Sequence, residues 1–296
     1  MAKISLSVVK NEADVIESMI RHNSAFVDHM HIVDNNSADR TKEIVRSLVS
    51  EGLPIQLSTN DLVGHRQRHI LNELINNHHP NEDIILLDAD EFLRVTPEGA
   101  KMDGNPVTAL FSSDRVYGIP MVTYLPSAHD DTDALDPVKR LQWRRKSEPK
   151  PEFKVAVPAW LKRPVDLGPG SHMILHQEMY KCRGLEIAHL PIRSLDQLIS
   201  KILIGSFNLR LRSYGKLEAT HWRDMAQHIL ENGIPKKQDF IPLANRIGMH
   251  TPADLIHDPL PVPTHTLKYT SKDDTSALHN LMHFTADIVA KLEGKL

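Results

Sequence analysis

The apolar positions in the first third of the chain follow two spacings in turn. Short apolar or alternating runs, typical of β-strands, occur at 4–9, 30–33, 54–57 and 84–87. Between them, apolar residues recur every three or four positions, which predicts amphipathic helices over 13–23, 41–50 and 62–76. Strands and helices that alternate in this way predict a parallel sheet covered by helices on both faces.

The strand expected at 84–92 runs straight into acids, because its sequence is Ile-Ile-Leu-Leu-Asp-Ala-Asp-Glu-Phe. Ligands of open α/β sheets bind beyond the carboxyl ends of the strands, so Asp88, Asp90 and Glu91 are expected to crowd one such place. If the extended conformation persists, Asp88 and Asp90 point to the same side. Acids this close repel one another unless a cation or protons intervene, and Mg2+ or Mn2+ suits carboxylate oxygens. The alternative is an acidic turn with a helix starting after Asp88.

Polar residues also follow the first two expected strands. Asn11 and Glu12 come after the first, and Asn11 is predicted to cap the next helix with Glu12 in its first turn. Asp34, Asn36 and Ser37 come after the second, in a segment that also reads as a turn with capping side chains. Parallel strands would bring both loops to the edge of the sheet where the acids lie.

Beyond residue 100 the pattern changes. Strands are predicted at 107–111, 117–124, 153–160 and 185–189, separated by Pro-rich or charged loops. Ser194 is predicted to cap a helix, the chain is mostly helical to about residue 232, and a closing helix is expected over 274–292. We therefore expect an α/β domain over 1–193 and a helical C-terminal region over 194–296.

Composition excludes several classes of protein. With 35 basic and 38 acidic residues, the net charge of -3 does not favour nucleic acid as a partner. The single cysteine, Cys182, excludes a disulfide framework and a thiolate zinc cluster. The polar start does not resemble a signal peptide, and no run of about 18 apolar residues follows. A cytoplasmic location is therefore expected.

Four segments together resemble the metal-dependent glycosyltransferases of the A-type fold, specifically the family-2-like bacterial branch with an Asp-x-Asp-Glu-Phe motif. Their order and spacing match over roughly residues 4–205. The segments are Val-Lys-Asn-Glu at 9–12, Val-Asp-Asn-Asn-Ser-Ala-Asp-Arg-Thr at 33–41, Leu-Asp-Ala-Asp-Glu-Phe-Leu at 87–93 and His-Leu-Pro-Ile-Arg-Ser at 189–194. The resemblance implies one Rossmann-like mixed sheet flanked by helices, with a mostly helical C-terminal extension.

The resemblance also implies a nucleotide-sugar donor, with UDP as the first expectation, bound over the carboxyl edge of the sheet. In that case Asn11 and Glu12 line the nucleoside pocket. Asp34 faces the base, with Asn36 and Ser37 close by.

The implied metal is Mn2+ or Mg2+, which would bridge the diphosphate. Asp90 is expected to be its main ligand, and Asp88 is expected near the ribose and the metal. His189 is expected to complete the metal shell, with His172 as the second choice. A buried histidine bonded to a backbone carbonyl is the alternative for His189. Either Lys154 or Arg145 is expected to hold phosphate oxygens.

Catalysis of this kind needs charge stabilisation on the departing diphosphate and a base for the acceptor hydroxyl. Enzymes of this branch take the base from an acid past the metal motif, often in a Glu-Asp pair. The only such pair here, at 82–83, precedes the motif. Glu91 is our choice, and an acid that only orients the loop is its alternative. Other open candidates are Glu178, Glu186 and Asp196.

These expectations describe an inverting transfer to a saccharide or lipid-linked acceptor, in the setting of bacterial surface polysaccharide synthesis. A nucleotidyltransferase would need a Gly-rich loop after the first strand, which 10–12 lacks. A non-catalytic sugar- or nucleotide-binding protein and a metal-dependent phosphatase are the other rivals. The region after 194 is expected to complete the acceptor side. Its basic residues near apolar positions also suit a homo-oligomer, a helix pair, or peripheral contact with the inner face of a membrane.

Overall fold

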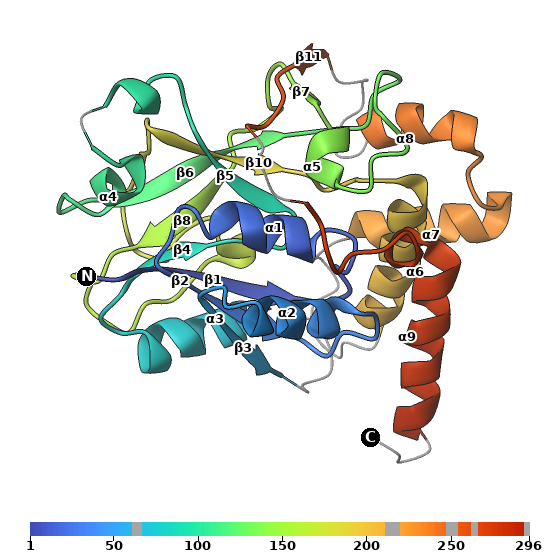
Figure 1. Ribbon diagram of the computed structural model, residues 1–296, viewed down its shortest axis with the longest axis horizontal. Helices are drawn as coiled ribbons and strands as arrows, with labels where there is room; N and C mark the ends of the chain where they lie inside the picture. The colour runs from blue at the N-terminus through green and yellow to red at the C-terminus, as the bar shows by residue number, and fades with distance from the viewer. Residues whose placement is uncertain (61–66, 103, 211–219, 247–253, 262–265, 293–296) are drawn as a thin grey trace.

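The computed structural model describes residues 1–60, 67–102, 104–210, 220–246, 254–261 and 266–292. A single mixed sheet forms its centre, with helices against it and a helical C-terminal region at one side (Figure 1). This architecture confirms the expected fold class. The boundary expected at 193 stays a prediction.

Four parallel strands form the N-terminal half of the sheet, in the order β3-β2-β1-β4. They are β1 Lys3–Val9, β2 His29–Asp34, β3 Ile55–Thr59 and β4 Asp83–Leu86. The connecting helices are α1 Ile16–Asn23, α2 Thr41–Ser50 and α3 Gln67–Glu73, the last continued by a π-helical turn, Leu74–His78. Residues 62–66 of the helix expected over 62–76 lie outside the described residues.

Both faces of this half are buried, which explains the apolar run in β4. Ile85 packs in one cluster with residues of α1 and α2, whereas Ile84 packs in another cluster with residues of α3. Successive residues of a strand point to opposite faces, so apolar residues at consecutive positions suit a strand that is covered on both sides. The polar residues that interrupt β1 and β2, Ser5, Ser7 and His31, are buried as well.

The second half of the sheet is mixed. β8 pairs antiparallel with β4, and the order continues β8-β6-β10-β5, with β9 beside β6. These strands are β5 Glu91–Val95, β6 Val116–Thr123, β8 Phe153–Val157, β9 Met179–Lys181 and β10 Leu185–His189. β10 runs parallel to β6, and β6 and β4 both run antiparallel to β8, so the carboxyl ends of β4, β6 and β10 share one edge. A separate two-stranded sheet joins β7 Trp143–Arg145 to β11 Leu255–His257.

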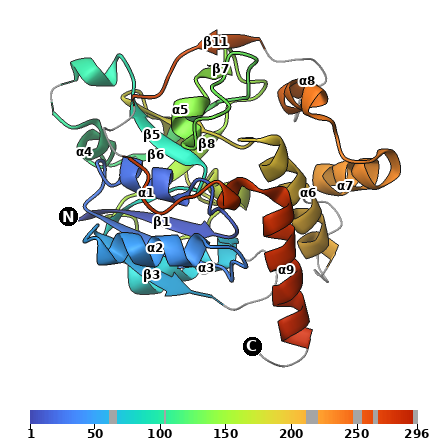
Figure 2. The same cartoon turned by 45° about the vertical axis from the view of Figure 1, so that its right-hand side comes forward.

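The remaining elements are helical. Before residue 194 they are a 3-10 turn Gly99–Lys101, α4 Pro106–Leu110, α5 Pro137–Arg140 and a 3-10 turn Pro169–Ser171. After it come α6 Leu195–Arg210, α7 Thr220–Asn232, a 3-10 turn Lys237–Asp239, α8 Phe240–Arg246, a 3-10 turn Asp273–Thr275 and α9 Ala277–Leu292. Both α7 and α9 pack against α6 (Figure 2). Residues 211–219 of the expected helical stretch lie outside the described residues. None of the helices in the described residues combines the length and apolar character needed to cross a membrane.

A strap before α9 returns the chain to the N-terminal half. The buried carboxylate of Glu17 on α1 accepts hydrogen bonds from the backbone N–H groups of Lys268, Tyr269 and Thr270, at 2.8–2.9 Å. Arg40, which precedes α2, pairs with Asp274 at 3.0 Å. The C-terminal region is thus fastened to the parallel half as well as to the sheet edge.

Two predicted strands are wrong in their extent or type. Residues 107–111 belong mainly to α4, because the side chain of Asn105 accepts a hydrogen bond from the N–H of Val107 at 2.8 Å and Pro106 takes the first helical position. The run 84–92 is broken: β4 ends at Leu86, a turn follows, and β5 begins at Glu91. The break occurs because β5 leaves β4 to pair antiparallel with β10.

The predicted cap by Asn11 is also wrong. α1 begins at Ile16 with no side-chain cap, and Asn11 has a positive φ of 56°. Its side chain instead accepts a hydrogen bond from the N–H of Ala38, in the loop after β2. A contact between two loops therefore replaces the local cap that the sequence suggested.

Candidate active site

The loops after β1 and β2 hold each other in place. Asn11 Oδ1 accepts the N–H of Ala38 at 2.8 Å, and Ser37 Oγ accepts the N–H of Asn11 at 3.0 Å. Asp34 Oδ1 accepts the N–H of Ser37 at 3.0 Å, and Asn36 has a positive φ of 58°. The turn that the sequence indicated at 34–37 is present, and it brings four of the predicted donor-site residues together.

One oxygen in this pair of loops stands out. Asp34 is fully buried, and its Oδ2 has no hydrogen-bond partner among the described residues. A buried polar atom without a partner costs free energy, and most such atoms in folded proteins are paired. An unpaired carboxylate oxygen at the carboxyl end of β2 is therefore a candidate acceptor for a hydrogen bond from a ligand.

Next to these loops, Asp88 and Glu91 enclose the ammonium group of Lys154. Lys154 Nζ lies 2.5 Å from Asp88 Oδ2 and 3.2 Å from Glu91 Oε1. Glu91 Oε2 accepts the N–H of Asp88 at 2.9 Å, and Asp88 Oδ1 accepts the side-chain N–H of Gln67. The side chains of Lys154 and Glu91 are both 1% exposed, so this part of the acid motif is packed into the protein.

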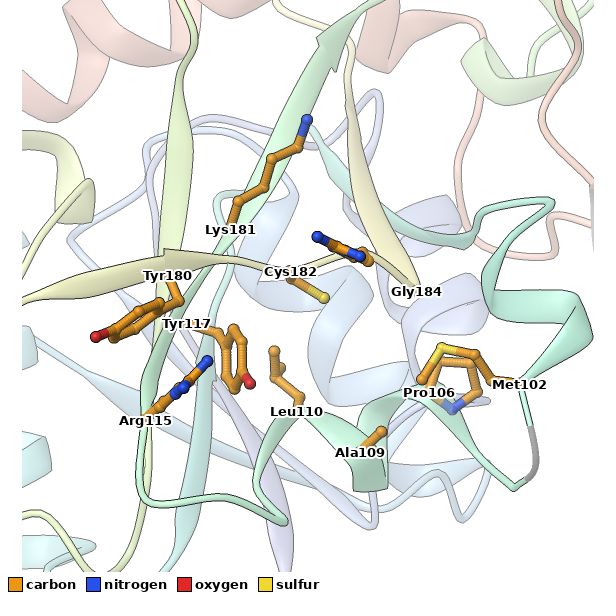
Figure 3. Close-up of a pocket in the computed structure, with 11 residues that line it drawn as sticks. Met102, Pro106, Ala109, Leu110, Arg115, Tyr117, Tyr180, Lys181, Cys182 and Gly184 are labelled. Atoms are coloured by element: carbon orange, nitrogen blue, oxygen red, sulfur yellow. The ribbon is translucent and has the colours of Figure 1, made fainter.

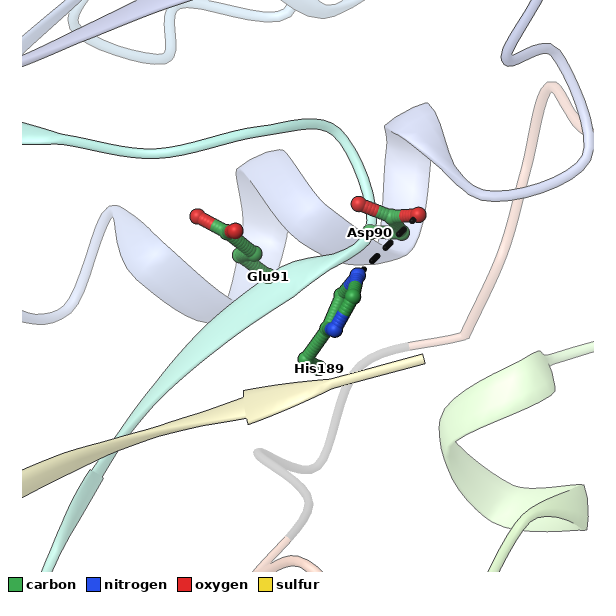
Figure 4. A group of neighbouring side chains, drawn as sticks. All are labelled: Asp90, Glu91 and His189. Atoms are coloured by element: carbon green, nitrogen blue, oxygen red, sulfur yellow. Dashed lines mark ion pairs between the residues drawn. The ribbon is translucent and has the colours of Figure 1, made fainter. Parts of the chain in front are cut away.

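Asp90 points into a different set of partners. Its Oδ2 lies 3.8 Å from His189 Nε2, 3.2 Å from Lys201 Nζ and 3.6 Å from Arg193 Nη1. Figure 4 shows the ring of His189, at the end of β10, directed at Asp90 in the turn before β5, with Glu91 at the start of β5. Asp88 and Asp90 thus contact different residues. The expectation that they point to the same side assumed a continuous strand, whereas β4 ends at Leu86 and β5 begins at Glu91.

Arg193 and Lys201 are functional candidates that the sequence did not single out. The guanidinium of Arg193 is 1% exposed and pairs with Asp14 at 2.7 Å and with Glu12 at 2.6 Å, besides Asp90. It therefore joins the loop after β1, the acid motif and the segment after β10. The only signal in the sequence was the presence of Arg193 in the recognised segment 189–194; Lys201, on α6, left none.

Burial and neighbouring charges set the protonation of the cluster. Burial opposes ionisation of Asp90, but Lys201, His189 and Arg193 outweigh it and lower the pKa of Asp90. Burial, together with the charge of Asp88, raises the pKa of Glu91 well above its usual range. Burial also lowers the pKa of His189, which favours the neutral imidazole that can bind a metal.

The donor atoms fit a divalent cation in part. Asp90, Glu91 and His189 each offer an oxygen or nitrogen, and these atoms lie within 4.8 Å of one another. Oxygen donors with one imidazole suit Mn2+ or Mg2+. Both oxygens of Glu91 and both of Asp88 already have partners. Asp90 Oδ2 also has a partner, Lys201 Nζ at 3.2 Å, but Asp90 and His189 face each other, so these two residues are the ligands that we consider first.

His172 and Arg145 lie apart from this group, whereas Glu91 belongs to it but is enclosed. His172 Nδ1 lies 2.8 Å from the backbone oxygen of Phe153, which places its ring against β8 beside Lys154. Arg145 on β7 pairs with Glu148 at 3.3 Å. Glu91 is 1% exposed and held by Lys154, so its geometry does not support direct contact with an acceptor hydroxyl.

No protein-family model and no curated protein matches this chain. Among solved structures, it is similar to the mannosyltransferase PcManGT from Pyrobaculum calidifontis in complex with GDP-Man and Mn2+, at 15% identity and a TM-score of 0.39, covering 100% of this chain and 88% of that one. It is also similar to GalNAc-T7 with UDP, GalNAc and Mn2+, at 13% identity and a TM-score of 0.35, covering 82% of this chain. A third is S. aureus TarS, at 10% identity and a TM-score of 0.35, covering 78% of this chain.

This chain spans only part of two of those proteins, namely 56% of GalNAc-T7 and 43% of TarS. At such identities and scores the likenesses carry no argument about activity, donor or metal. The functional conclusion therefore depends on the geometry described above.

Proposed function

We propose that this protein is a metal-dependent glycosyltransferase that moves a sugar from a nucleotide-sugar donor, a UDP-sugar in the first instance, to a saccharide or lipid-linked acceptor. One observation carries the proposal. Asp90 and His189 face each other at the same edge of the sheet as the unpaired buried oxygen of Asp34. A carboxylate–imidazole pair at the same sheet edge as an unpaired buried hydrogen-bond acceptor, at the carboxyl ends of parallel strands, supports a site for a metal–diphosphate and its nucleoside.

On the nucleoside side, we assign base recognition to Asp34, whose free oxygen can accept an N–H from the ligand. Asn11, Asn36 and Ser37 keep that oxygen in place, because their loops are bonded to one another. The carboxylate of Glu12 contacts Arg193, so we assign Glu12 to the wall of the proposed nucleoside site.

On the diphosphate side, Asp90 and His189 would hold Mn2+ or Mg2+, which when bound neutralises charge on the departing nucleoside diphosphate. Arg193 and Lys201 fix the direction of the Asp90 carboxylate. The ammonium group of Lys154 already contacts the carboxyl groups of Asp88 and Glu91. We therefore assign Lys154 to holding Asp88 in place rather than to binding phosphate.

Glu91 receives a positioning role in this proposal. Its carboxylate accepts the N–H of Asp88 and contacts Lys154, so it shapes the turn that presents both aspartates. The acceptor hydroxyl would attack the anomeric carbon while the sugar–phosphate bond breaks, with inversion, and its proton would pass to a carboxylate of the acceptor side.

The helical C-terminal region is proposed as part of the same site. Lys201 on α6 lies 3.2 Å from Asp90, and the buried apolar residues Leu198 and Ile202 of α6 pack against Leu125 and Ile192 of the α/β domain. We therefore assign α6, and the described helices that pack on it, to the acceptor side of the edge and to the catalytic unit.

Calorimetric titration with UDP, GDP and CMP, with and without MnCl2, tests the function. One nucleotide is expected to bind in a manner that needs the metal. Asp90→Asn is expected to weaken that binding roughly 100-fold, because a charged metal ligand becomes neutral. Arg46→Ala, an exposed position on α2, is the control and should bind like the wild type. Absence of nucleotide binding, or binding that ignores both Mn2+ and Asp90, would contradict the proposal.

A further inference from the structure

A pocket lies at the opposite edge of the sheet from Asp90 and His189. It has a volume of about 500 Å³, within the range of small-molecule sites. Gly184, which lines it, directly precedes β10, and His189 ends the same strand. A strand of this length separates the two places by about 16 Å. The pocket is therefore distinct from the proposed donor site.

Two close approaches of the chain form its walls. β9 pairs in parallel with the start of β6, which sets Tyr180 directly beside Tyr117 (Figure 3). On the other side, a Cβ on Gly99 would lie 2.0 Å from the carbonyl oxygen of Gly184, so only glycine lets these two segments meet. The contact holds the loop before β10 against the segment that leads into α4. The shape of the pocket is thus built by packing of the backbone.

The charges around the pocket are positive and lack compensating ion pairs. Arg115, Lys181 and Arg183 line it, and in the described part of the chain none of the three forms an ion pair. The guanidinium of Arg115 lies 4.6 Å from the centre of the Tyr180 ring, a cation–π contact that leaves its hydrogen-bond donors available. No acidic side chain occurs among the described lining residues.

Acidic side chains do lie in the neighbourhood. Glu178, and to a smaller extent Asp114, act on the phenol of Tyr180 and raise its pKa. Glu98 acts in the same way on Cys182, whose buried thiol is in the pocket wall. These acids lie outside the lining, so they reduce the positive potential without occupying the place of a bound anion.

The lining chemistry selects the ligand. Met102 and the ring of Tyr117 offer apolar surface, which suits the C–H face of a sugar ring. The arginines offer planar donors that match a carboxylate or a phosphate. We propose that this pocket binds an anionic saccharide, as a second binding site for a carboxylate- or phosphate-bearing acceptor glycan. The choice of a saccharide over other anions rests on the proposed transferase function.

Binding is measured by calorimetry and saturation-transfer NMR with trigalacturonic acid, glucose 6-phosphate and the neutral maltotriose, without Mn2+. We expect at least one anionic probe to bind and maltotriose to bind roughly ten-fold more weakly or less. The probe that binds tells whether a carboxylate or a phosphate is preferred. Arg115→Ala and Arg183→Ala should each weaken binding roughly ten-fold, because each removes a charge-assisted hydrogen bond.

Arg46→Ala, which removes an exposed arginine on α2 far along the chain, is the matched control and should bind like the wild type. Thermal unfolding of each variant confirms that it is folded. The proposal is overturned if neither anionic probe binds, if maltotriose binds equally well, or if both arginine substitutions leave binding unchanged.

Asp90→Asn separates this proposal from the proposed function. It should weaken metal-dependent nucleotide binding roughly 100-fold and leave binding of the anionic probe unchanged. If the anionic probe binds but no nucleotide does, the proposed anion-binding pocket is supported and the transferase proposal fails. If nucleotide binds and the probes do not, the pocket proposal alone fails.

Discussion

The two ends of β10 place charged groups in opposite settings. At its carboxyl end, Asp90 and Glu91 are buried, and each is matched by a cation from a distant segment, Arg193 for Asp90 and Lys154 for Glu91. At its amino end, Arg115 and Arg183 are exposed and form no ion pair in the described part of the chain.

The difference separates charges that the fold depends on from charges that are open to a ligand. Buried charges cost several kcal/mol of desolvation unless they are paired, so removing one partner leaves the other uncompensated. Exposed cations incur little of that cost and can be removed without harm to folding. Substitution of an arginine should therefore lower the free energy of unfolding strongly at the carboxyl end of β10 and only slightly at its amino end.

The largest effect should come from Arg193→Met at the buried end. We expect the free energy of unfolding to fall by about 3–5 kcal/mol, because Asp14, Glu12 and Asp90 would all lose a buried partner. Urea denaturation measures the change. Arg183→Ala, at the exposed end, serves as the comparison and should change the free energy of unfolding by less than about 0.5 kcal/mol. Equal effects of the two substitutions would show that the two ends do not differ in this way.

A third group sharpens the comparison, because His31 is buried and only other histidines, and no acid, are among the described charges that shift its pKa. His31 on β2 is 3% exposed, and its ring nitrogens lie 2.8 Å from His79 Nε2 and 2.8 Å from Ser58 Oγ. Burial, with a smaller effect from His79, lowers the pKa of His31 to about 4. The unfolded chain then binds more protons than the folded one between about pH 4 and pH 6.5, so stability falls as the pH falls through that range.

At pH 5 this group should cost the folded state up to about 2 kcal/mol relative to pH 7. Urea denaturation of the wild type and of His31→Gln at both pH values measures it, since the other titrating groups are common to both proteins. The variant should lose less stability than the wild type between pH 7 and pH 5. Identical losses would mean that His31 titrates alike in the folded and unfolded states.

The smallest effect concerns salt. Raising NaCl from about 0.05 M to about 0.5 M should weaken binding of the anionic probe severalfold, because exposed charges are screened within a few ångströms at high salt. The buried pairs at the other end are screened far less, so the stability difference between wild type and Arg193→Met should change by under about 0.5 kcal/mol. Probe binding that ignores salt would indicate that apolar contacts dominate in the pocket.

The sequence indicated the parallel half of the fold well. The strands predicted at 4–9, 30–33 and 54–57 correspond to β1, β2 and β3, and the acids do follow β4 at the carboxyl edge. These features depend on the spacing of apolar residues within one short segment. They can therefore be predicted from that segment alone. The strand predicted at 107–111 failed for a local reason too, since the cap by Asn105 outweighed an apolar run.

Only the tertiary structure decided which charges meet. Arg193 lies 179 positions from Asp14, and Lys154 lies 66 positions from Asp88, yet each pair is in direct contact. No periodicity links residues so far apart, because such pairs form when separate strands and helices pack together. For the same reason, the basic pocket could not be expected from sequence: its walls come from the starts of β6 and β10, which become neighbours only when the sheet is assembled.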